Sequence, residues 1–181
     1  YALDDSMELR VDALQKFFKE NKKNKIFIFG FTFMIFKYFL MKLKKLKIKL
    51  DFSDSVLIHG GGWKKLENES INSNEFKELI YRYTNISSVH DYYGMVEQTG
   101  SIFMECQNGN LHASIFSDIL VRKSDDFSIA KVGEKGIIQT LSLLPLSYPG
   151  HSLLTEDEGV FLGEDDCGCG RLGKYFKIYG R

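Results

Sequence analysis

The sequence has no excess charge of either sign, too few cysteines for a disulfide framework and no apolar run long enough to cross a bilayer. Its 24 basic residues balance 24 acidic residues, so bulk electrostatics gives no reason to expect nucleic acid or an anionic membrane as a partner. Three cysteines are an odd number, and no signal-peptide pattern opens the chain. We therefore expect a cytoplasmic protein whose thiols are free or bound to a metal.

The longest apolar stretch, residues 26–41, contains a single lysine, Lys37. A membrane-spanning helix needs about 20 apolar residues, and Gly30 and Thr32 interrupt this shorter run. We predict instead a buried strand over 25–29, a turn at Gly30 and a helix over 32–43. The lysines that follow suit the negative C-terminal end of a helix, so stable membrane insertion is not expected.

The first half of the chain alternates helix-like and strand-like patterns with short connections. Apolar residues at helical spacing predict helices, and short apolar runs predict buried strands. In chain order the elements are a helix over 4–22, the strand and helix described above, a strand over 55–59, a helix over 75–83 and a strand over 87–89. This alternation is typical of an α/β fold with a mostly parallel sheet and flanking helices.

Two stretches follow directly after predicted strands, where ligands of such sheets bind. The first, residues 60–64, is a run of three glycines followed by Trp63 and Lys64. The second, residues 93–97, follows the strand over 87–89. We expect both stretches to face the same crevice at the carboxyl ends of the strands.

The second half of the chain is rich in short β-like runs separated by Gly, Asn, Asp and Ser. They cover 101–104, 111–116, 119–122, 127–132, 136–144, 159–162 and 175–179, with a loop around Pro145 and Pro149. This pattern predicts an antiparallel sheet or a small barrel. We expect an α/β subdomain over 1–100 and a β-rich subdomain over 101–181, together forming a fragment of a longer protein.

Residues 91–100 read Asp-Tyr-Tyr-Gly-Met-Val-Glu-Gln-Thr-Gly. An aromatic ring can stack on a base, a glycine lets the backbone approach a ligand closely, and a carboxylate can bind Mg²⁺. Tyr93, Gly94 and Glu97 therefore make a candidate nucleotide site. The alternative on residue types alone is a structural turn.

Every cysteine falls in one of two short stretches. Cys106 precedes His112 by one turn, and Cys167 and Cys169 form a C-x-C knuckle. Three thiolates and one imidazole would complete a closed tetrahedral site for structural Zn²⁺. The alternative is a set of unrelated buried thiols and a solvent-exposed His112. The remaining histidines show no ligand spacing, although His59, beside the glycine run, leaves a functional role open.

Taken in order, these motifs resemble the adenylate-forming superfamily of acyl-CoA synthetases and ligases. One similar branch is the phenylacetate–coenzyme A ligases, which share the Glu-Cys…Leu-His and Cys-x-Cys-Gly-Arg pattern. The other is the acyl-protein synthetases of the LuxE type, to which the glycine run and Tyr-Gly-Met-Val-Glu-Gln are most similar. The ordered motifs are Gly60-Gly61-Gly62-Trp63-Lys64, Tyr93-Gly94-Met95-Val96-Glu97, Gly133-Glu134-Lys135-Gly136, Thr155-Glu156-Asp157 and Gly180-Arg181.

The resemblance implies an ATP site. Tyr93 would pack on the adenine, Gly94 and Met95 would lie beside the nucleotide, and Glu97 would be the catalytic ligand of the Mg²⁺ that bridges the ATP phosphates. The remaining implied contacts are the adenine pocket at Gly60, Gly61 and Gly62, the ribose hydroxyls at Asp157, and the ribose and interdomain hinge at Arg181.

The resemblance also implies an activity, the ATP-dependent activation of a fatty or aryl carboxylic acid and its transfer to a thiol. The thiol belongs to a protein in the LuxE type, which brings in an acyl-accepting protein or reductase partner, and to coenzyme A in the phenylacetate type. A non-enzymatic, zinc-stabilised binding module is the remaining alternative. The aromatic residues of 31–36 could border an acyl pocket or form core.

The sequence departs from the family pattern in two respects. Many members have Thr or Ser before the glutamate, whereas Val96 stands here, so we expect Gln98 or Thr99 to substitute or the contact to be absent. The phosphate-binding loop, the catalytic lysine and the acyl-accepting cysteine of the family match nothing in this sequence. We therefore expect the 181-residue chain alone to be inactive.

Overall fold

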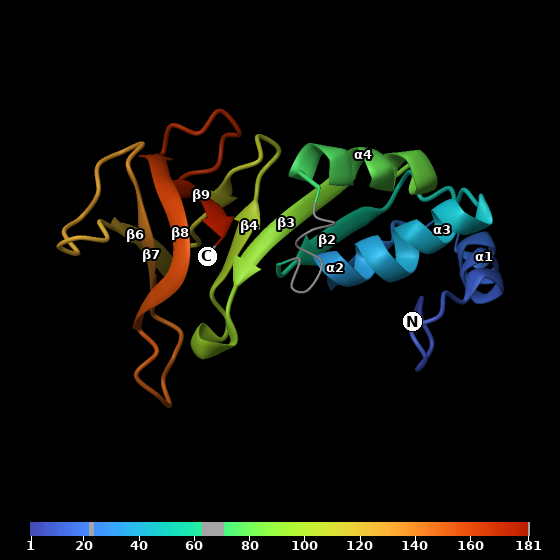
Figure 1. The fold of residues 1–181 in the computed structure, drawn as a ribbon, viewed down its shortest axis with the longest axis horizontal. Helices are drawn as coiled ribbons and strands as arrows, with labels where there is room; N and C mark the ends of the chain where they lie inside the picture. The colour runs from blue at the N-terminus through green and yellow to red at the C-terminus, as the bar shows by residue number, and fades with distance from the viewer. Residues whose placement is uncertain (22–23, 63–70, 181) are drawn as a thin grey trace. The chain divides into compact units, whose positions relative to one another are not determined.

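The computed structural model describes residues 1–21, 24–62 and 71–180. The chain divides into two compact units, Tyr1–Val89 and His90–Arg181. The first unit carries the helices and the second is built almost entirely of strands (Figure 1).

The first unit begins with a short loop before its first helix. The predicted helix over 4–22 is observed only as α1 (Val11–Glu20). The Asp4 carboxylate accepts hydrogen bonds from the N–H groups of Ser6 and Glu8, and Met7 adopts a left-handed φ of 63°. These local bonds compete with a helix, so residues 4–10 turn back on themselves instead.

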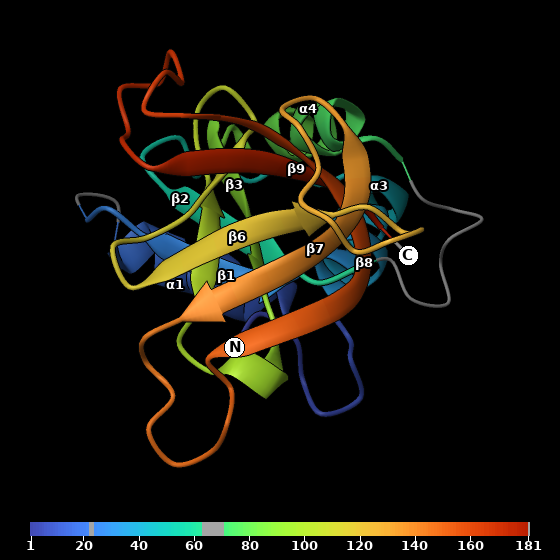
Figure 2. The ribbon, with the colours of Figure 1, turned by 90° about the vertical axis from the view of Figure 1, so that its left-hand side faces the viewer.

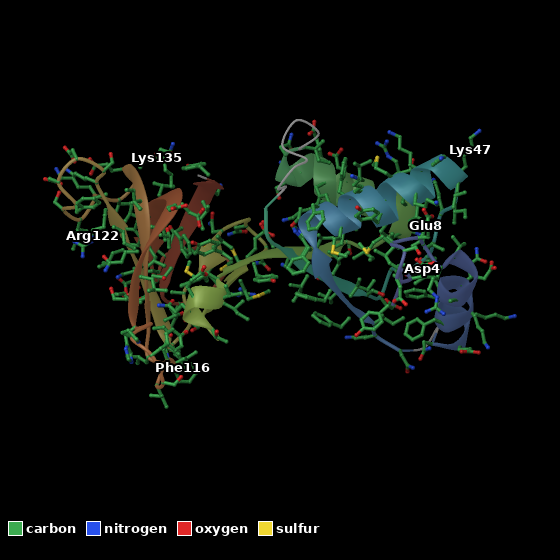
Figure 3. The ribbon with its side chains drawn as sticks, turned by 60° about the horizontal axis from the view of Figure 1, so that its bottom comes forward. Asp4, Glu8, Lys47, Phe116, Arg122 and Lys135 are labelled. Atoms are coloured by element: carbon green, nitrogen blue, oxygen red, sulfur yellow. The ribbon has the colours of Figure 1, made fainter. Side chains whose placement is uncertain are left out.

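A parallel strand pair and a long helical segment form the centre of the first unit. Strand β1 (Phe27–Phe31) pairs in parallel with β2 (Val56–Gly60), with Phe31 opposite Gly60. The helix predicted over 32–43 is present as three consecutive pieces, α2 (Thr32–Met34), the π-helical η1 (Ile35–Leu40) and α3 (Met41–Leu46). Lys47 ends it with a left-handed φ of 56° (Figure 3).

Helix α4 (Ser73–Thr84) completes the first unit and begins at a capping box. The Asn72 side chain accepts from the N–H of Glu75, whose carboxylate accepts from the N–H of Asn72. This reciprocal pair satisfies two of the backbone donors that a helix start leaves without partners. The helix packs its apolar side chains, Phe76 and Ile80 among them, into a core of twelve buried apolar residues.

The second unit is an antiparallel sheet. Its strands are β3 (Ser88–Gly94), β4 (Ile102–Glu105), β5 (Leu111–His112), β6 (Ser117–Arg122), β7 (Lys135–Ser142), β8 (Ser152–Glu164) and β9 (Lys174–Gly180). Across the sheet their order is β3-β4-β5-β9-β8-β7-β6. Strands β6 to β9 lie side by side, and β6 forms an edge, so the sheet is not closed into a barrel (Figure 2).

Three predicted runs of the second unit differ from the structure. Of the run over 111–116, only β5 (Leu111–His112) is a strand. The run over 127–132 is not a strand, because Phe127 has a left-handed φ of 57° and the Asp126 carboxylate accepts from the Ser128 N–H. It contributes one isolated bridge, Ile129 to Arg122. Strand β8 starts at Ser152 rather than at 159. Residues 152–158 include acidic side chains, but they alternate between exposed and half-buried positions, as a strand at the surface of a sheet does.

No helix within the described residues combines the length and apolar character that crossing a bilayer requires.

Candidate functional site

Tyr93 lies inside a strand, not in a turn after one. Strand β3 continues to Gly94, and Tyr93 is opposite Phe103 of β4. The Tyr93 ring packs near Phe103 and meets Phe176 edge-on, with centroids 6.0 and 6.5 Å away. The direction of the Tyr93 side chain is therefore fixed by its place on β3 and by the rings of Phe103 and Phe176.

The Tyr93 hydroxyl donates a 2.8 Å hydrogen bond to Oδ2 of Asp157. Asp157 lies on β8, so strand pairing brings together two residues that are 64 positions apart. Thr155 holds the Asp157 backbone, because its hydroxyl donates to the Ile138 carbonyl and accepts from the Asp157 N–H. A carboxylate offers about four acceptor positions, so one tyrosine bond leaves Asp157 chemically able to bind a diol.

Glu97 lies on a short 3-10 turn, η3 (Val96–Gln98), directly after β3 and Met95. Its side chain is exposed and Met95 is half-buried. An added Cβ at Gly94 would lie 3.2 Å from the Ser101 carbonyl, so the backbone is close-packed where the turn begins. The arrangement presents a carboxylate to solvent at the end of a strand, as a hard cation requires of a ligand.

The two residues proposed to replace the family's hydroxyl before Glu97 differ in accessibility. Gln98 is fully buried, and its amide nitrogen donates to the Gly150 carbonyl at 2.8 Å. It therefore cannot reach a ligand at the exposed turn. Thr99 is exposed, and its hydroxyl donates to the Val96 carbonyl. Val96 itself is 86% exposed.

The glycine run belongs to the first unit. Gly60 ends β2 and is buried, and its carbonyl accepts from the Thr32 hydroxyl. Gly61 has a left-handed φ of 77°, which a side chain would strain, and nothing lies within 4 Å of a Cβ built on Gly62. The shared crevice with Tyr93 stays a prediction. Trp63, Lys64 and Arg181 lie outside the described residues.

The three cysteines and His112 meet in the second unit. Their ligand atoms all lie within 4.8 Å of one another. A tight turn brings Cys106 toward His112. The Cys106 backbone N–H donates to the Asn110 carbonyl, and Gly109 has a left-handed φ of 73°. Cys167 and Cys169 come from the loop between β8 and β9, where the Gly170 N–H donates to the Cys167 carbonyl.

The spacing of these atoms fits a tetrahedral metal. Donors at zinc–ligand distances of about 2.0–2.3 Å stand roughly 3.5–3.8 Å apart at tetrahedral angles. The Cys106 and Cys167 sulfurs are 4.0 Å apart, and the Cys169 sulfur lies 3.5 Å from Nε2 of His112. Cys106, His112 and Cys167 are buried, so they are not the unrelated thiols and exposed imidazole of the alternative interpretation.

One thiol is set up to ionise near neutral pH. Burial raises the pKa of Cys167, but hydrogen bonds from the Cys169 backbone and the Asn110 side chain outweigh it and lower the pKa to about 6. Burial raises the pKa of Cys169, with the neighbouring thiols adding to the shift. A thiolate is the form that binds a metal, so the lowered pKa of Cys167 favours the form that could bind one.

Sequence reasoning missed the partners around this cluster. The Asn110 amide donates to the Cys167 sulfur at 3.6 Å, and its place between Cys106 and His112 was the available signal. Tyr175 stacks on the His112 ring at 5.6 Å. The pKa of Tyr175 is raised, chiefly because its hydroxyl is hydrogen-bonded to Asp166.

Two surface grooves are unrelated to the predicted site residues. One, of about 660 Å³, lies along α4 in the first unit and includes Lys49 and Arg82. The other, of about 520 Å³, lies beside β6 in the second unit and includes Ile119 and Lys174. Neither is lined by a residue of the Tyr93–Asp157 pair or of the thiol cluster.

Known proteins with similar sequences are ligases. The family model described as "Acyl-protein synthetase, LuxE" matches residues 3–181. The long-chain-fatty-acid–luciferin-component ligase of Aliivibrio fischeri is 26% identical over 166 residues, covering 87% of this chain and 42% of the relative. Its Vibrio harveyi counterpart is 25% identical over 117 residues, covering 62% and 30%. The chain thus spans less than half the length of these relatives.

Solved structures of adenylate-forming ligases share the fold. A 2-hydroxyisobutyryl-CoA ligase in the postadenylation state matches with a TM-score of 0.67 and 16% identity, covering 93% of this chain and 35% of its own. ATP-bound MatB from Rhodopseudomonas palustris matches with a TM-score of 0.58 and 15% identity, covering 92% and 33%. The family match over nearly the whole sequence shows that the chain belongs to the LuxE family of acyl-protein synthetases.

Proposed function

We propose that the complete gene product uses ATP to activate a long-chain carboxylic acid and passes the acyl group to a protein thiol. The observation that carries this proposal is the 2.8 Å hydrogen bond between Tyr93 and Asp157. Two residues assigned to one nucleotide from separate motifs lie together in the folded chain. A coincidental turn at Tyr93 would have no reason to meet that particular carboxylate.

Each group then has a role in binding ATP. The Tyr93 ring packs against the adenine, and Asp157, oriented by its bonds to Tyr93 and Thr155, accepts hydrogen bonds from the ribose hydroxyls. The glycines of the run at 60–62 offer backbone without side chains to the purine. Glu97 is the carboxylate available to hold Mg²⁺, which neutralises phosphate charge when bound.

The chemistry has two steps. In the first, an oxygen of the substrate carboxylate attacks the α-phosphorus of ATP, the bond to the β-phosphate oxygen breaks, and pyrophosphate leaves. In the second, a thiolate attacks the activated carbonyl and AMP leaves with the electron pair of the carbonyl–oxygen bond. The described residues contribute by holding the nucleotide in line and by stabilising charge.

The thiol cluster has a structural role in this proposal. Cys106 and Cys167 are buried, their sulfurs face each other, and the Cys167 sulfur also accepts from the Asn110 amide. A closed Cys₃His site has no open position for a catalytic water. The four residues would therefore hold Zn²⁺ to fix the loops around Cys106 and Cys169, and none of them is the acyl acceptor.

The names of the relatives support the choice of substrate and acceptor. Both act on a long-chain fatty acid and a luciferin component. The solved structures with the same fold include a 2-hydroxyisobutyryl-CoA ligase, but it shares the fold at low identity. We therefore favour a protein thiol as the acceptor over coenzyme A.

The decisive experiment measures exchange of labelled pyrophosphate into ATP by the complete gene product, with acids from acetate to palmitate. We expect exchange with a long-chain acid, and about a hundredfold loss or more in Glu97→Gln, as when one preorganised charge-stabilising group is removed. Glu164→Gln, an exposed glutamate on β8, is the matched control. Exchange that no acid supports would refute the proposal.

A second measurement identifies the acceptor. The protein is incubated with ATP and labelled fatty acid, then denatured and treated with hydroxylamine. Label that stays on the denatured protein and is released by hydroxylamine indicates a protein thioester. Label found only on coenzyme A would overturn the choice of acceptor while leaving acid activation intact.

A further inference from the structure

Gln98, next to the proposed metal ligand Glu97, is the only residue of its turn with a fully buried side chain in the described structure. Its amide nitrogen donates to the Gly150 carbonyl at 2.8 Å and lies 3.4 Å from the Thr140 carbonyl. These contacts join it to residues 52 and 42 positions away. A buried amide is costly unless hydrogen-bonded. The Gln98 nitrogen has these two partners and its oxygen has none among the described residues, so the nitrogen alone anchors the turn to strand β7 and to the loop before β8.

A second contact ties the same turn to the same loop. The Thr99 N–H donates to the Tyr148 hydroxyl oxygen at 3.1 Å. The Tyr148 ring lies over Gly150, where an added Cβ would come within 2.3 Å of the ring. The Gly150 N–H donates to the Tyr148 carbonyl at 2.8 Å. The loop is therefore tightly folded at the two acceptors, the Gly150 carbonyl for Gln98 and the Tyr148 hydroxyl for Thr99.

The turn has little else to hold it. Val96 and Glu97 are exposed. The other bonds are local: the backbone bonds from Gln98 to Met95 and from Ser101 to Gln98, both 3.2 Å long, and the 3.1 Å bond from the Thr99 hydroxyl to the Val96 carbonyl. A single 3-10 turn with few buried contacts opens easily. The direction of Glu97 thus depends on the two residues that follow it, Gln98 and Thr99, more than on its own contacts.

From these contacts we infer that Gln98 and Tyr148 are positioning residues that hold Glu97 in place for the metal–ATP complex. The inference rests on the proposed function. Neither side chain touches substrate; they act by fixing the backbone directly after the carboxylate, at Gln98 and Thr99. Geometric errors of about 1 Å in a catalytic group can cost about a hundredfold in rate, so such an anchor has a measurable effect.

The test replaces Gln98 by methionine, which keeps the volume and removes both donors. Gln139→Met is the matched control, because Gln139 also makes two side-chain hydrogen bonds in the second unit, to Arg122 and Ser152. We expect hydrogen exchange over residues 95–100 to be at least about tenfold faster in Gln98→Met, the effect of losing roughly one buried hydrogen bond. Gln139→Met leaves it unchanged.

The functional measurements use Mn²⁺ as a spectroscopic substitute for Mg²⁺. In the complete gene product we expect Gln98→Met to weaken Mn²⁺ binding in the presence of ATP by about tenfold and to raise the Mg²⁺ requirement of pyrophosphate exchange equally. The KM for the acid stays within about twofold. Tyr148→Phe, at a half-exposed site, gives the same pattern with a smaller shift.

The outcomes separate the two proposals. A wild-type protein without pyrophosphate exchange would refute the proposed function. A wild-type protein with exchange, and Gln98→Met and Tyr148→Phe variants with unchanged Mn²⁺ binding and unchanged exchange over 95–100, would refute this inference alone. Equal loss of acid and metal affinity in Tyr148→Phe would indicate general damage and also overturn it.

Discussion

Twelve buried apolar residues form the core of the first unit among its described residues, whereas the second unit, of similar length, has a core of seven. The buried polar side chains show the reverse bias, with six in the second unit and four in the first. Two of the cysteines of the thiol cluster are also buried there. The first unit is stabilised mainly by apolar area and the second by directed contacts.

This difference has a functional meaning. Apolar burial is non-directional, so it can build a scaffold but does not set the distance between two chosen atoms. Hydrogen bonds and metal ligands do set such distances. The second unit contains the Tyr93–Asp157 pair, the Gln98 anchor and the Cys₃His cluster, and its smaller core is the consequence of committing interior positions to them.

The largest expected effect comes from removing a ligand of the thiol cluster. Because metal-binding free energy is folding free energy, we expect His112→Asn, or a strong chelator, to lower the melting midpoint of the second unit by at least about 10 °C. A domain of this size shifts by about 4–8 °C for each kcal/mol. Hydrogen exchange, followed peptide by peptide, should increase across 90–181 before it increases across 1–89.

The control is His151→Asn, since His151 is exposed and outside the cluster. Metal analysis of the purified protein accompanies both variants. A structural zinc site is normally filled. Less than about half an equivalent of zinc in folded wild-type protein would therefore contradict the claim that the cluster stabilises the second unit by binding a metal.

The next effect compares the same substitution in both cores. Ile80 on α4 and Ile138 on β7 are both completely buried, and replacing either by alanine should cost about 2–5 kcal/mol. Ile138 packs against Gly159, where an added Cβ would lie 2.6 Å from its side chain. Strand β7 is paired on both edges and cannot move in to fill the space. The loss of stability in Ile138→Ala should therefore lie at the upper end of this range.

Chelator distinguishes the two variants. The urea midpoint of the second unit is measured by hydrogen exchange. In the presence of chelator, this midpoint should be lower in Ile138→Ala than in wild type, because both changes weaken the second unit. The chelator should not deepen the effect of Ile80→Ala on the first unit. Identical behaviour of the two variants would mean that the chain unfolds as one body and that the contrast between the cores has no thermodynamic consequence.

The same contrast explains what the sequence could and could not predict. The helix from Thr32 and the strand before Gly60 follow from apolar periodicity, which reports non-directional burial. The end of β3 and the start of β8 were misplaced, because Tyr93 and the acidic residues around Asp157 have the composition of a loop. The grouping of the four residues of the thiol cluster was predictable, since Cys and His are few and their spacing is short.

The Gln98 anchor was not predictable from local pattern. Its burial depends on carbonyl groups 42 and 52 positions away. The local sequence Glu-Gln-Thr is polar throughout and does not indicate that the Gln98 side chain is buried. The run at 127–132 failed for the opposite reason: its alternation fits a strand, but a left-handed Phe127 turns the chain first. Directed contacts decide both cases, and they follow from tertiary structure.

The smallest effect concerns one of the directed contacts of the first unit, the capping box of α4. Asn72→Ala removes the acceptor of the Glu75 N–H and should cost about 1 kcal/mol. Asn74→Ala, an exposed substitution inside the same helix, is the control and should be neutral or slightly stabilising, because alanine has the higher helix propensity. Faster exchange should then appear in the first turn of α4 alone. If Asn72→Ala instead loosens residues throughout 1–89, the first unit depends on a directed contact as strongly as the second, and its larger apolar core does not make it tolerant.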